Sequence, residues 1–488
     1  MIDVLTVAAV KEAERRVMDG KASEDELISL AAQKLFECVL KNIKSNTQKT
    51  QKKQKILVVY GGGNNGADGL TSAALLAKSG YSVYICAAVL EKNDGVRNRE
   101  KICQELGVWQ VSLDDDFCGF DVIVDAVFGF GLDREVGGPV AEIIEKINGS
   151  GAYVISADIP SGLCADCGIA LGACVRADET VTFSCLKPGL MLNEAKDYCG
   201  EITVADIGVP HESDCKLFEK SDIVLKKRSR SGHKYDYGKV AVIGGSYKMP
   251  GAALMAFESS VAALKSGAGL SVLCVPQNLA AAYQCRVKEC MLDFIPSDDE
   301  GILFDTACLE RIMQKTDSIV IGMGMTVNDN LKKTLEFLCK NFGGTLIIDA
   351  GALGALVGNL GILRGAKCKV ILTPHVGEFN RLMPGEAKDL LYRVRSFSAE
   401  YGTVTLCKGA VSLVSDGKTT YFCDFGTPAL SKGGSGDVLA GIIGALSVRY
   451  EPALACAMGC YFLGDAAKRA EKELSEESVI ASDIIVRI

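Results

Sequence analysis

The stretch that decides the fold is KILVVYGGGNNGADG, which spans residues 55–69. It joins a short apolar, β-branched run, Ile56–Tyr60, to three consecutive glycines, and a helical pattern follows. Gly61, Gly63 and Gly66 satisfy the spacing G-x-G-x-x-G after a predicted strand and before a predicted helix. Such a turn presents backbone N–H groups and a helix N-terminus to an anion such as a pyrophosphate. A tight turn without a ligand remains the alternative for this motif taken alone.

Strands and helices alternate on either side of this stretch. Helices are predicted at Leu5–Lys41, Thr71–Ser79 and Ala141–Ile147, with a polar loop at Ser45–Lys55. Further strands are predicted at Tyr81–Leu90, Val122–Val127, Tyr153–Ala157, Thr180–Phe183 and Ile202–Ala205. Such alternation predicts an α/β fold, a Rossmann-like doubly wound and largely parallel sheet.

The pattern breaks at the polar stretch His211–Lys220 and restarts afterwards. We therefore expect two domains, 1–221 and 222–488, with the boundary near Asp222. Strands of the second domain are predicted at Lys239–Ile243, Leu270–Val275, Ser318–Ile321, Thr345–Ile348, Val370–Leu372 and Thr403–Leu406. No short-period repeat is present, which disfavours a solenoid.

Composition narrows the function classes. The 488 residues suggest two to four domains at roughly 100–200 residues each. A net charge of −8 disfavours nucleic-acid binding, because phosphate contacts need a basic field. No apolar run approaches the ~20 residues of a transmembrane helix, so no membrane partner is expected. Without an export signal, a cytoplasmic location is expected, with the 20 cysteines reduced and packed as small hydrophobes.

Two more polar loops fall at strand ends in the first half. Asp125 lies in VDAVFGFGL, residues 124–132, and Asp158 lies in ADIPSGL, residues 157–163. Each aspartate alone could merely cap a helix or turn. The carboxyl ends of parallel strands share one crevice, however, so all three loops can converge there. Together they favour a binding site.

The strings GGGNNGADG, VDAVFGFGL and ADIPSGL resemble the NAD(P)H-hydrate epimerase domain over most of residues 1–210. The resemblance implies a Rossmann-like domain that interconverts the R and S forms of NAD(P)H hydrated at C6. It implies a potassium ion held by Asn65, Asp125 and Ser161, whose oxygen donors suit a hard cation. It implies substrate contacts from Asn64, Asn65, Gly66, Ala67, Asp68, Gly129, Phe130, Gly131, Leu132, Asp133, Arg134, Glu135 and Asp158. Epimerisation needs acid–base help, which we assign to Asp125.

Two features of this half depart from the family pattern, and one cysteine pair raises a separate question. Ala67 stands where the family usually has glycine, which would strain the loop if φ were positive there. Leu30-Ala31-Ala32-Gln33 replaces the family's usual segment in the first helix. Cys164-Ala165-Asp166-Cys167 has the C-x-x-C spacing of zinc or redox sites, but no second such pair follows.

The strongest motif of the second half is GTPALSKGGSGDVLAG, residues 426–441. A glycine-rich loop opens into an apolar helix, whose free N–H groups would form an anion hole. Asp437 lies in the first helical turn, where it could be a simple cap or the base that takes a hydroxyl proton during phosphoryl transfer. The loop is not a Walker A motif.

With LTPHVGE at residues 372–378, this motif resembles the ADP- or ATP-dependent NAD(P)H-hydrate dehydratase of the ribokinase-like superfamily over about 225–488. The resemblance implies that Ala252, Gly324, His375 and Asp437 contact the hydrated substrate. It implies that the adenine nucleotide, with Mg²⁺, is held by Lys408, Gly409, Ala410, Val411, Ser412 and Gly436. In this mechanism the C6 hydroxyl of the S form is phosphorylated with Asp437 as base, and phosphate then leaves. Gly351 replaces an aspartate of the family, and Gly324-Met325-Thr326 replaces a Gly-Leu-Gly.

Both motif sets in one chain predict a two-domain enzyme that repairs hydrated NADH and NADPH at the expense of ADP or ATP. The resemblance to fused, bifunctional chains implies ADP as the co-substrate, and the resemblance to the family implies a homo-oligomer. One alternative is a sugar or vitamin kinase with a regulatory N-terminal domain. A second is a dinucleotide-binding module without epimerase chemistry. A plain NAD dehydrogenase fits less well, because the first half has no clear catalytic histidine and Asn64-Asn65 is atypical.

Overall fold

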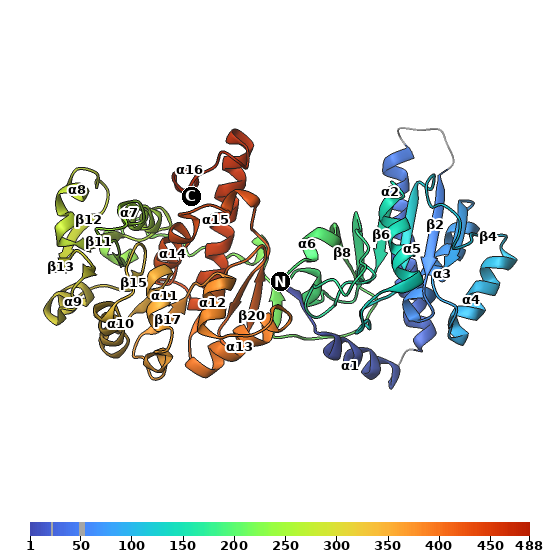
Figure 1. Ribbon diagram of the computed structural model, residues 1–488, viewed down its shortest axis with the longest axis horizontal. Coiled ribbons are helices and arrows are strands. Elements are labelled where there is room, and N and C mark those ends of the chain that lie inside the picture. Colours follow the sequence, from blue (N-terminus) through green and yellow to red (C-terminus); the bar gives the residue numbers. More distant parts are fainter. Residues whose placement is uncertain (21–22, 48–53) are drawn as a thin grey trace. The chain divides into compact units, whose positions relative to one another are not determined.

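The structure is a computed structural model that describes residues 1–20, 23–47 and 54–488. The chain divides into two compact units, one of Ile2–Ser213 and the other of Asp214–Ile488 with Met1 (Figure 1). The second unit begins at Asp214, eight residues before the predicted boundary near Asp222. Both units are α/β, so the predicted fold class is confirmed for each.

The first unit is built on a parallel sheet with the strand order β4-β3-β2-β5-β6-β7-β8. Its strands are β2 (Lys55–Tyr60), β3 (Ser82–Ala87), β4 (Trp109–Gln110), β5 (Val122–Ala126), β6 (Tyr153–Ala157), β7 (Glu179–Phe183) and β8 (Glu201–Ala205). All described pairings in this sheet are parallel. The order reverses between β2 and β5, and such a switch point is where doubly wound sheets bind ligands.

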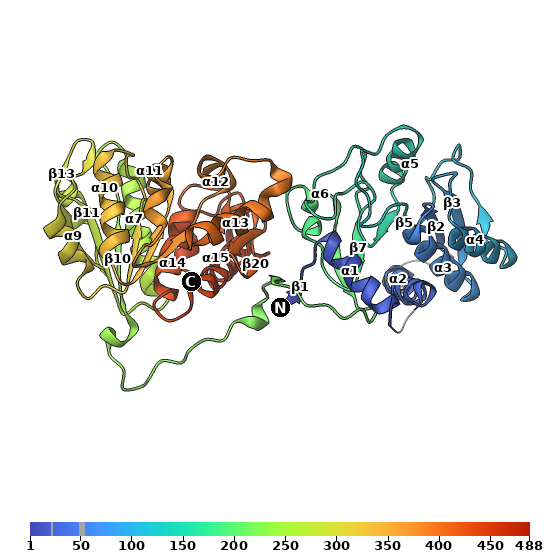
Figure 2. The ribbon, with the colours of Figure 1, turned by 90° about the horizontal axis from the view of Figure 1, so that it is seen from below.

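Helices cover both faces of this sheet (Figure 2). They are α1 (Val7–Met18), α2 (Glu24–Thr47), α3 (Asn64–Lys78), α4 (Asp94–Glu105), α5 (Gly138–Gly149) and α6 (Ala195–Tyr198). On β2, Ile56, Val58 and Tyr60 pack with the apolar sides of α2 and α3. Leu57 and Val59 point the other way and pack with α5. Burial on both faces explains why β2 reads as an unbroken apolar run.

The predicted strands of this unit are confirmed, but the helices differ. The helix expected over Leu5–Lys41 is two helices, α1 and α2. Residues 48–53, in the middle of the predicted polar loop, lie outside the described residues, and α2 reaches Thr47. The glycine-rich motif was expected to continue as a loop through Asn64–Asp68, and this prediction is wrong: α3 begins at Asn64, so all five residues are helical. Ala67 is therefore helical and buried, so its side chain brings no positive-φ strain.

The second unit has a larger sheet, in which β9, β20, β19, β18, β17, β16, β15, β10, β11 and β12 lie in that order. These strands are β9 (Cys215–Leu217), β10 (Lys239–Ile243), β11 (Leu270–Pro276), β12 (Met291–Ile295), β15 (Ser318–Ile321), β16 (Thr345–Ile348), β17 (Lys369–Leu372), β18 (Val404–Cys407), β19 (Ser412–Ser415) and β20 (Thr420–Cys423). A short hairpin of β13 (Ser297–Asp298) and β14 (Gly301–Ile302) stands apart. The pairings from β12 to β18 are parallel, and β18-β19-β20 is antiparallel.

The helices of this unit are α7 (Pro250–Lys265), α8 (Ala280–Gln284), α9 (Thr306–Met313), α10 (Asp329–Asn341), α11 (Ala350–Leu356), α12 (Val376–Leu382), α13 (Leu390–Tyr401), α14 (Ser435–Leu446), α15 (Pro452–Leu474) and α16 (Ala481–Ile485). A continuous apolar core joins α7, α14, α15 and α16 to the central strands. Close packing of α14 depends on Gly441, where a Cβ would lie 2.1 Å from the Ser259 carbonyl oxygen on α7. The N-terminus of α14 is thereby fixed beside the carboxyl ends of the strands.

Most of the cysteines lie in the interior of the protein. All cysteines are free, and most are buried; Cys118 and Cys285 are exposed and Cys164 is partly exposed. Of the helices in the described ranges, none combines the length and the apolar character that crossing a membrane requires.

Candidate active sites

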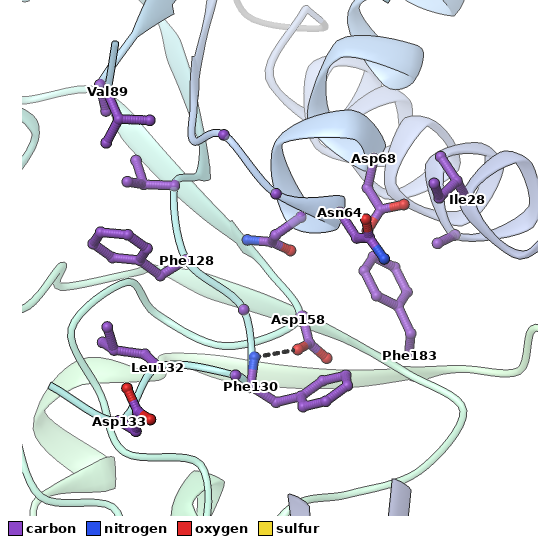
Figure 3. Close-up of a pocket in the computed structure, with 18 of the residues that line it drawn as sticks. Ile28, Asn64, Asp68, Val89, Phe128, Phe130, Leu132, Asp133, Asp158 and Phe183 are labelled. Atoms are coloured by element: carbon purple, nitrogen blue, oxygen red, sulfur yellow. Dashed lines mark hydrogen bonds between the residues drawn. The ribbon is translucent and has the colours of Figure 1, made fainter. Parts of the chain in front are cut away.

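The first unit contains a cavity of about 1110 Å³ at the carboxyl ends of β2, β3, β5 and β6 (Figure 3). Its walls combine apolar side chains such as Phe128 and Phe183 with a few polar ones, the composition typical of ligand pockets. The sheet's switch point thus lies at a real cavity.

The turn between β2 and α3 forms one wall of this cavity. Two glycines let the backbone of this turn pack closely. A Cβ on Gly61 would lie 2.0 Å from the Val127 carbonyl oxygen, and a Cβ on Gly66 would lie 2.1 Å from the Gly61 carbonyl oxygen. Gly63 caps α3 without a side-chain hydrogen bond, so the first N–H groups of the helix stay free for an anion. Asn64 also lines the cavity, and its amide donates to Glu24 Oε1 at 2.7 Å.

A buried ion pair lies at the end of β6. Asp158 has a φ of 68°, and its Oδ2 accepts the Phe130 N–H at 2.9 Å. Its Oδ1 lies 2.6 Å from Lys187 Nζ, which also donates to Thr182 Oγ1 and to the Phe183 carbonyl oxygen. Both charged groups line the cavity. Lys187 was not predicted from the sequence; a lysine within the apolar, buried segment 185–192 was the available signal.

Asp68 faces the same cavity from α3 (Figure 3). Its side chain is buried, and Oδ1 has no hydrogen-bond partner among the described residues. Burial, reinforced by the charge of Asp158, raises the pKa of Asp68 well above its usual value. Asp68 therefore holds a proton more readily than an exposed aspartate does, while Asp158 is paired with the ammonium group of Lys187. The two carboxyl groups of this cavity thus have different surroundings, one without a cationic partner among the described residues and one paired with Lys187.

Asp125 is enclosed rather than exposed to the cavity. Its carboxylate accepts from Ser156 Oγ at 2.8 Å and from Ser161 Oγ at 2.6 Å, and it is not among the residues that line the cavity. Burial raises the pKa of Asp125, and the Ser161 hydrogen bonds oppose this. The Asn65 amide is buried with neither its oxygen nor its nitrogen hydrogen-bonded to any described residue.

The donor set at Asn65, Asp125 and Ser161 fits a potassium ion. It offers an amide, a carboxylate and a hydroxyl oxygen, and the amide of Asn65 lacks a partner from the described residues. A Cβ on Gly129 would lie 3.3 Å from Asn65 Cγ and 3.1 Å from Asp158 Oδ2, so Asn65 and Asp158 are neighbours at the cavity wall. The described residues contain no cluster of three or more His, Cys, Asp or Glu side chains that could hold a metal.

The cavity does not include all of the expected substrate contacts. The expected residues that line it are Asn64, Asn65, Asp68, Gly129, Phe130, Gly131, Leu132, Asp133, Arg134 and Asp158. Gly66, Ala67 and Glu135 do not. Gly66 supports the turn through its close backbone contact, and Ala67 packs into the core.

In the second unit, Asp437 occupies the first turn of α14. Gly434, with a φ of 95°, caps this helix without a side-chain hydrogen bond, and the Ser435 N–H donates to the Lys432 carbonyl oxygen at 3.5 Å. Burial and the charge of Asp349 raise the pKa of Asp437 to about 7, and Lys408 opposes the shift. A carboxyl group poised at neutral pH suits a general base. The hydroxyl of Ser435, also buried at this helix end, has no partner among the described residues.

Asp349 and Lys408 form a second ion pair beside Asp437. Lys408 Nζ lies 3.0 Å from Asp349 Oδ1, whose side chain is only 3% exposed. A Cβ on Gly436 would lie 3.1 Å from Lys408 Nζ, so the ammonium group lies against the start of α14. Ala350, which follows Asp349 in the chain, has a φ of 46°, and positive φ values are unusual for alanine. No role was predicted for Asp349 from the sequence; its position directly after β16 was the available signal.

His375 lies next to Lys408 through a parallel bridge between the ends of β17 and β18. It caps α12: Nδ1 accepts the Gly377 N–H at 3.0 Å, and Glu378 Oε2 accepts the His375 N–H at 2.9 Å. The imidazole is otherwise exposed. His375, Lys408 and Asp437 are thus brought together at the strand ends.

The remaining predicted residues of this unit have less defined surroundings. Gly324, with a φ of 63°, follows β15, and Ala252 lies in the first turn of α7. Gly409, Ala410, Val411 and Ser412 form the turn from β18 into β19, where the Ser412 hydroxyl donates to the Gly409 carbonyl oxygen at 3.4 Å. No described contact joins this turn to Asp437.

Comparisons with known proteins cover both units. Residues 240–488 match a family model described as NAD(P)H-hydrate dehydratase, and residues 24–189 match one described as YjeF-related protein N-terminus. The bifunctional NAD(P)H-hydrate repair enzyme of Moorella thermoacetica is 32% identical over 92% of this chain and 89% of its own. This chain belongs to the bifunctional NAD(P)H-hydrate repair enzyme family.

Other members of this repair family are about as similar. The Escherichia coli enzyme of the same name is 32% identical over 88% of this chain and 83% of its own. Among solved structures, the ADP/ATP-dependent NAD(P)H-hydrate dehydratase from Bacillus subtilis covers 54% of this chain and 91% of its own, at 23% identity and a TM-score of 0.44. The family prediction made from the three glycine-loop strings and the α14 motif is confirmed.

Proposed function

We propose that this chain repairs hydrated NADH and NADPH, with an epimerase in residues 1–221 and a dehydratase in residues 222–488. The supporting observation is similarity that runs through both units at once: the repair enzyme of Moorella thermoacetica aligns with 92% of the chain. A sugar or vitamin kinase would account for only one of the two sites.

In the epimerase, the hydrated ring enters the cavity of the first unit. The C6 carbon bears a hydroxyl group and is bonded to the ring nitrogen, so protonation of that hydroxyl expels water and leaves an iminium ion. Water then returns to either face of the ring. Asp68, whose pKa is raised by burial, is suited to donate the proton, and Asp158, which is paired with Lys187, is suited to take one from the returning water.

The catalytic role that was predicted for Asp125 from the sequence is not kept in this proposal. It is enclosed by Ser156 and Ser161, so it has no access to the ring, and we assign it to ion binding and to the positioning of Ser161. Asn65, Asp125 and Ser161 would hold potassium, whose charge would favour the nearby anionic parts of the dinucleotide. The free N–H groups of α3 are suited to its pyrophosphate.

In the dehydratase, Asp437 takes the proton of the C6 hydroxyl group as its oxygen attacks the terminal phosphate of magnesium-bound ADP or ATP. The N-terminus of α14 and Lys408 neutralise the transferring group. Phosphate then leaves C6 with loss of a proton from C5, which restores the dihydronicotinamide. Ala252, Gly324 and His375 are assigned to the substrate, and Lys408–Ser412 with Gly436 to the nucleotide.

Family resemblance favours ADP as the phosphoryl donor, a homo-oligomeric assembly and a cytoplasmic location. One experiment tests the whole proposal. Mixed R and S hydrates are incubated with the protein, ADP and magnesium, and the dihydronicotinamide absorbance is followed. Full recovery is expected. Recovery of the S fraction alone would exclude the epimerase, and phosphorylation of a sugar or vitamin without any recovery would favour the kinase.

A further inference from the structure

The C-x-x-C turn, Cys164 to Cys167, belongs to neither candidate site. Its ends are closed by two backbone hydrogen bonds: the Cys164 N–H donates to the Ile169 carbonyl oxygen at 3.0 Å, and the Gly168 N–H donates to the Cys164 carbonyl oxygen at 2.8 Å. Residues three apart in such a turn have Cα atoms within about 7 Å, the range that a disulfide bond spans. The backbone therefore already holds the two cysteines at a distance compatible with a bond.

Neighbouring segments keep this turn in place. The Gly189 N–H donates to the Ala165 carbonyl oxygen at 2.7 Å, and the Asn193 amide donates to the Cys167 carbonyl oxygen at 2.7 Å. Asp166 Oδ1 accepts the Val7 N–H at 2.7 Å. A turn fixed at several points loses little conformational freedom when its two sulfur atoms join.

The two thiols interact directly, and they are not equivalent. The Cys167 thiol donates a hydrogen bond to the Cys164 sulfur, which also faces the N–H groups of Asp166 and Cys167. These donors favour the thiolate, so they hold the pKa of Cys164 below its usual value, whereas the same contact raises the pKa of Cys167. Cys164 is partly exposed and Cys167 is buried. This asymmetry gives an accessible nucleophile and a resolving thiol behind it.

The other cysteines of the described chain lack one or more of these features. Cys118 is exposed, but a hydrogen bond with Asp116 raises its pKa. Cys339 and Cys368 hydrogen-bond to each other, but both are buried. A metal role for Cys164 and Cys167 lacks ligands, because no third His, Cys, Asp or Glu of the described residues joins them in a metal-binding group.

We propose that Cys164 and Cys167 are a redox-active dithiol that exchanges with low-molecular-weight disulfides. The Cys164 thiolate attacks one sulfur of the external disulfide, forms a mixed disulfide and releases one thiolate. Cys167 then gives up its proton, and its sulfur attacks Cys164 Sγ to release the second. Two electrons pass from the protein to the external disulfide, which leaves as two thiols carrying the two protons.

The test uses the reduced full-length protein and glutathione disulfide. Remaining thiols are alkylated at intervals, and each cysteine-containing peptide is weighed. The peptide with Cys164 and Cys167 is expected to lose the mass of two hydrogen atoms before other cysteines react, and dithiothreitol should restore it. The Cys167→Ser variant is expected to stop at one glutathione adduct on Cys164. Cys118→Ser is the matched control and should behave as wild type.

A second readout separates thiolate chemistry from mere exposure. The alkylation rate of Cys164 should reach its plateau at a lower pH than that of exposed Cys118. The proposal is overturned if the wild-type peptide keeps both thiols while other cysteines oxidise, or if the Cys167→Ser variant carries no adduct at Cys164. Peptide mapping of the wild type decides between these outcomes even if a variant fails to fold. None of these readouts depends on hydrate repair.

Discussion

Lys187 Nζ lies 2.6 Å from Asp158 Oδ1, and the two side chains are only 1% and 5% exposed. Replacing Lys187 with methionine should therefore leave a buried carboxylate unpaired. We expect this variant to lose about 3–5 kcal/mol of stability in the first unit, and to lose epimerisation. Denaturant unfolding and the mixed-hydrate assay measure the two effects.

The double variant Asp158→Asn with Lys187→Met is the control for that change. Removing both charges should restore much of the stability, because no unpaired charge stays buried, but it should leave epimerisation absent. Dehydration of pure S hydrate should persist in both variants. Epimerisation at the wild-type rate in either of them would remove this ion pair from the proposed chemistry.

Asn65 has a buried amide with no partner among the described residues, which the proposed potassium ion would satisfy. We expect Asn65→Ala to reduce epimerisation by about tenfold or more and to abolish its dependence on potassium. Wild-type protein moved from potassium to tetramethylammonium salts should show the same loss. Dehydration of the S hydrate measures the second unit as an internal control. Potassium dependence unchanged in the variant would contradict the assignment.

The pKa of Asp437 is raised to about 7, and its ionisation should determine how the dehydration rate falls on the acidic side of the pH profile. Activity is expected to rise with pH through about 7 as the base ionises, and Asp437→Asn should abolish it while epimerisation continues. A pH profile of kcat with pure S hydrate and ADP is the measurement. Substantial dehydration by the variant would exclude Asp437 as the base.

The same pKa has a consequence for stability. A carboxyl group whose pKa is higher in the folded than in the unfolded chain makes folding less favourable as pH rises from about 4 to about 7. Asp437→Asn should therefore stabilise the second unit above pH 7 and have a smaller effect at pH 5. Thermal unfolding at the two pH values tests this, and equal effects at both would contradict it.

Asp349 raises the pKa of Asp437 and pairs with Lys408. Asp349→Asn should therefore move the acid limb of dehydration to lower pH, because the repelling carboxylate is gone. It should also reduce kcat, because Lys408 loses the partner that fixes it near α14. Asp416→Asn, in an exposed turn, is the matched control and should leave the profile unchanged. A limb that stays in place would assign Asp349 a purely structural role.

Gly351 stands where the family has an aspartate, and the structure supplies a reason. A Cβ there would lie 2.2 Å from the Met325 carbonyl oxygen. We expect Gly351→Ala to lower the stability of the second unit by roughly 1–3 kcal/mol. Gly361→Ala, where no atom lies within 4 Å of the added Cβ, should be nearly neutral. Comparable melting temperatures for the two variants would show that the backbone near Met325 yields readily.

Residues adjacent in sequence were enough to predict much of this protein. Buried strands such as β2 and β10 read as short apolar runs because both faces are covered, and glycines follow them because the chain turns closely there. The glycine loops and the α14 motif were enough to predict the family. Local pattern was less informative for Asn64–Asp68, where a glycine-rich segment continues as a helix because α3 packs on β2 and α2.

Tertiary structure decided which charged groups share an environment. Lys187 meets Asp158 across 29 residues, and Lys408 meets Asp349 across 59. Neither pair has a sequence signature, because parallel strands bring their carboxyl ends together regardless of the chain between them. Burial then raises the pKa of Asp68 and of Asp437, and it encloses Asp125. The sequence by itself therefore determined the fold and the family, whereas the three-dimensional arrangement decided how the pKa of buried carboxyl groups such as Asp68 and Asp437 is shifted, because such a shift depends on desolvation and on neighbours distant in the chain.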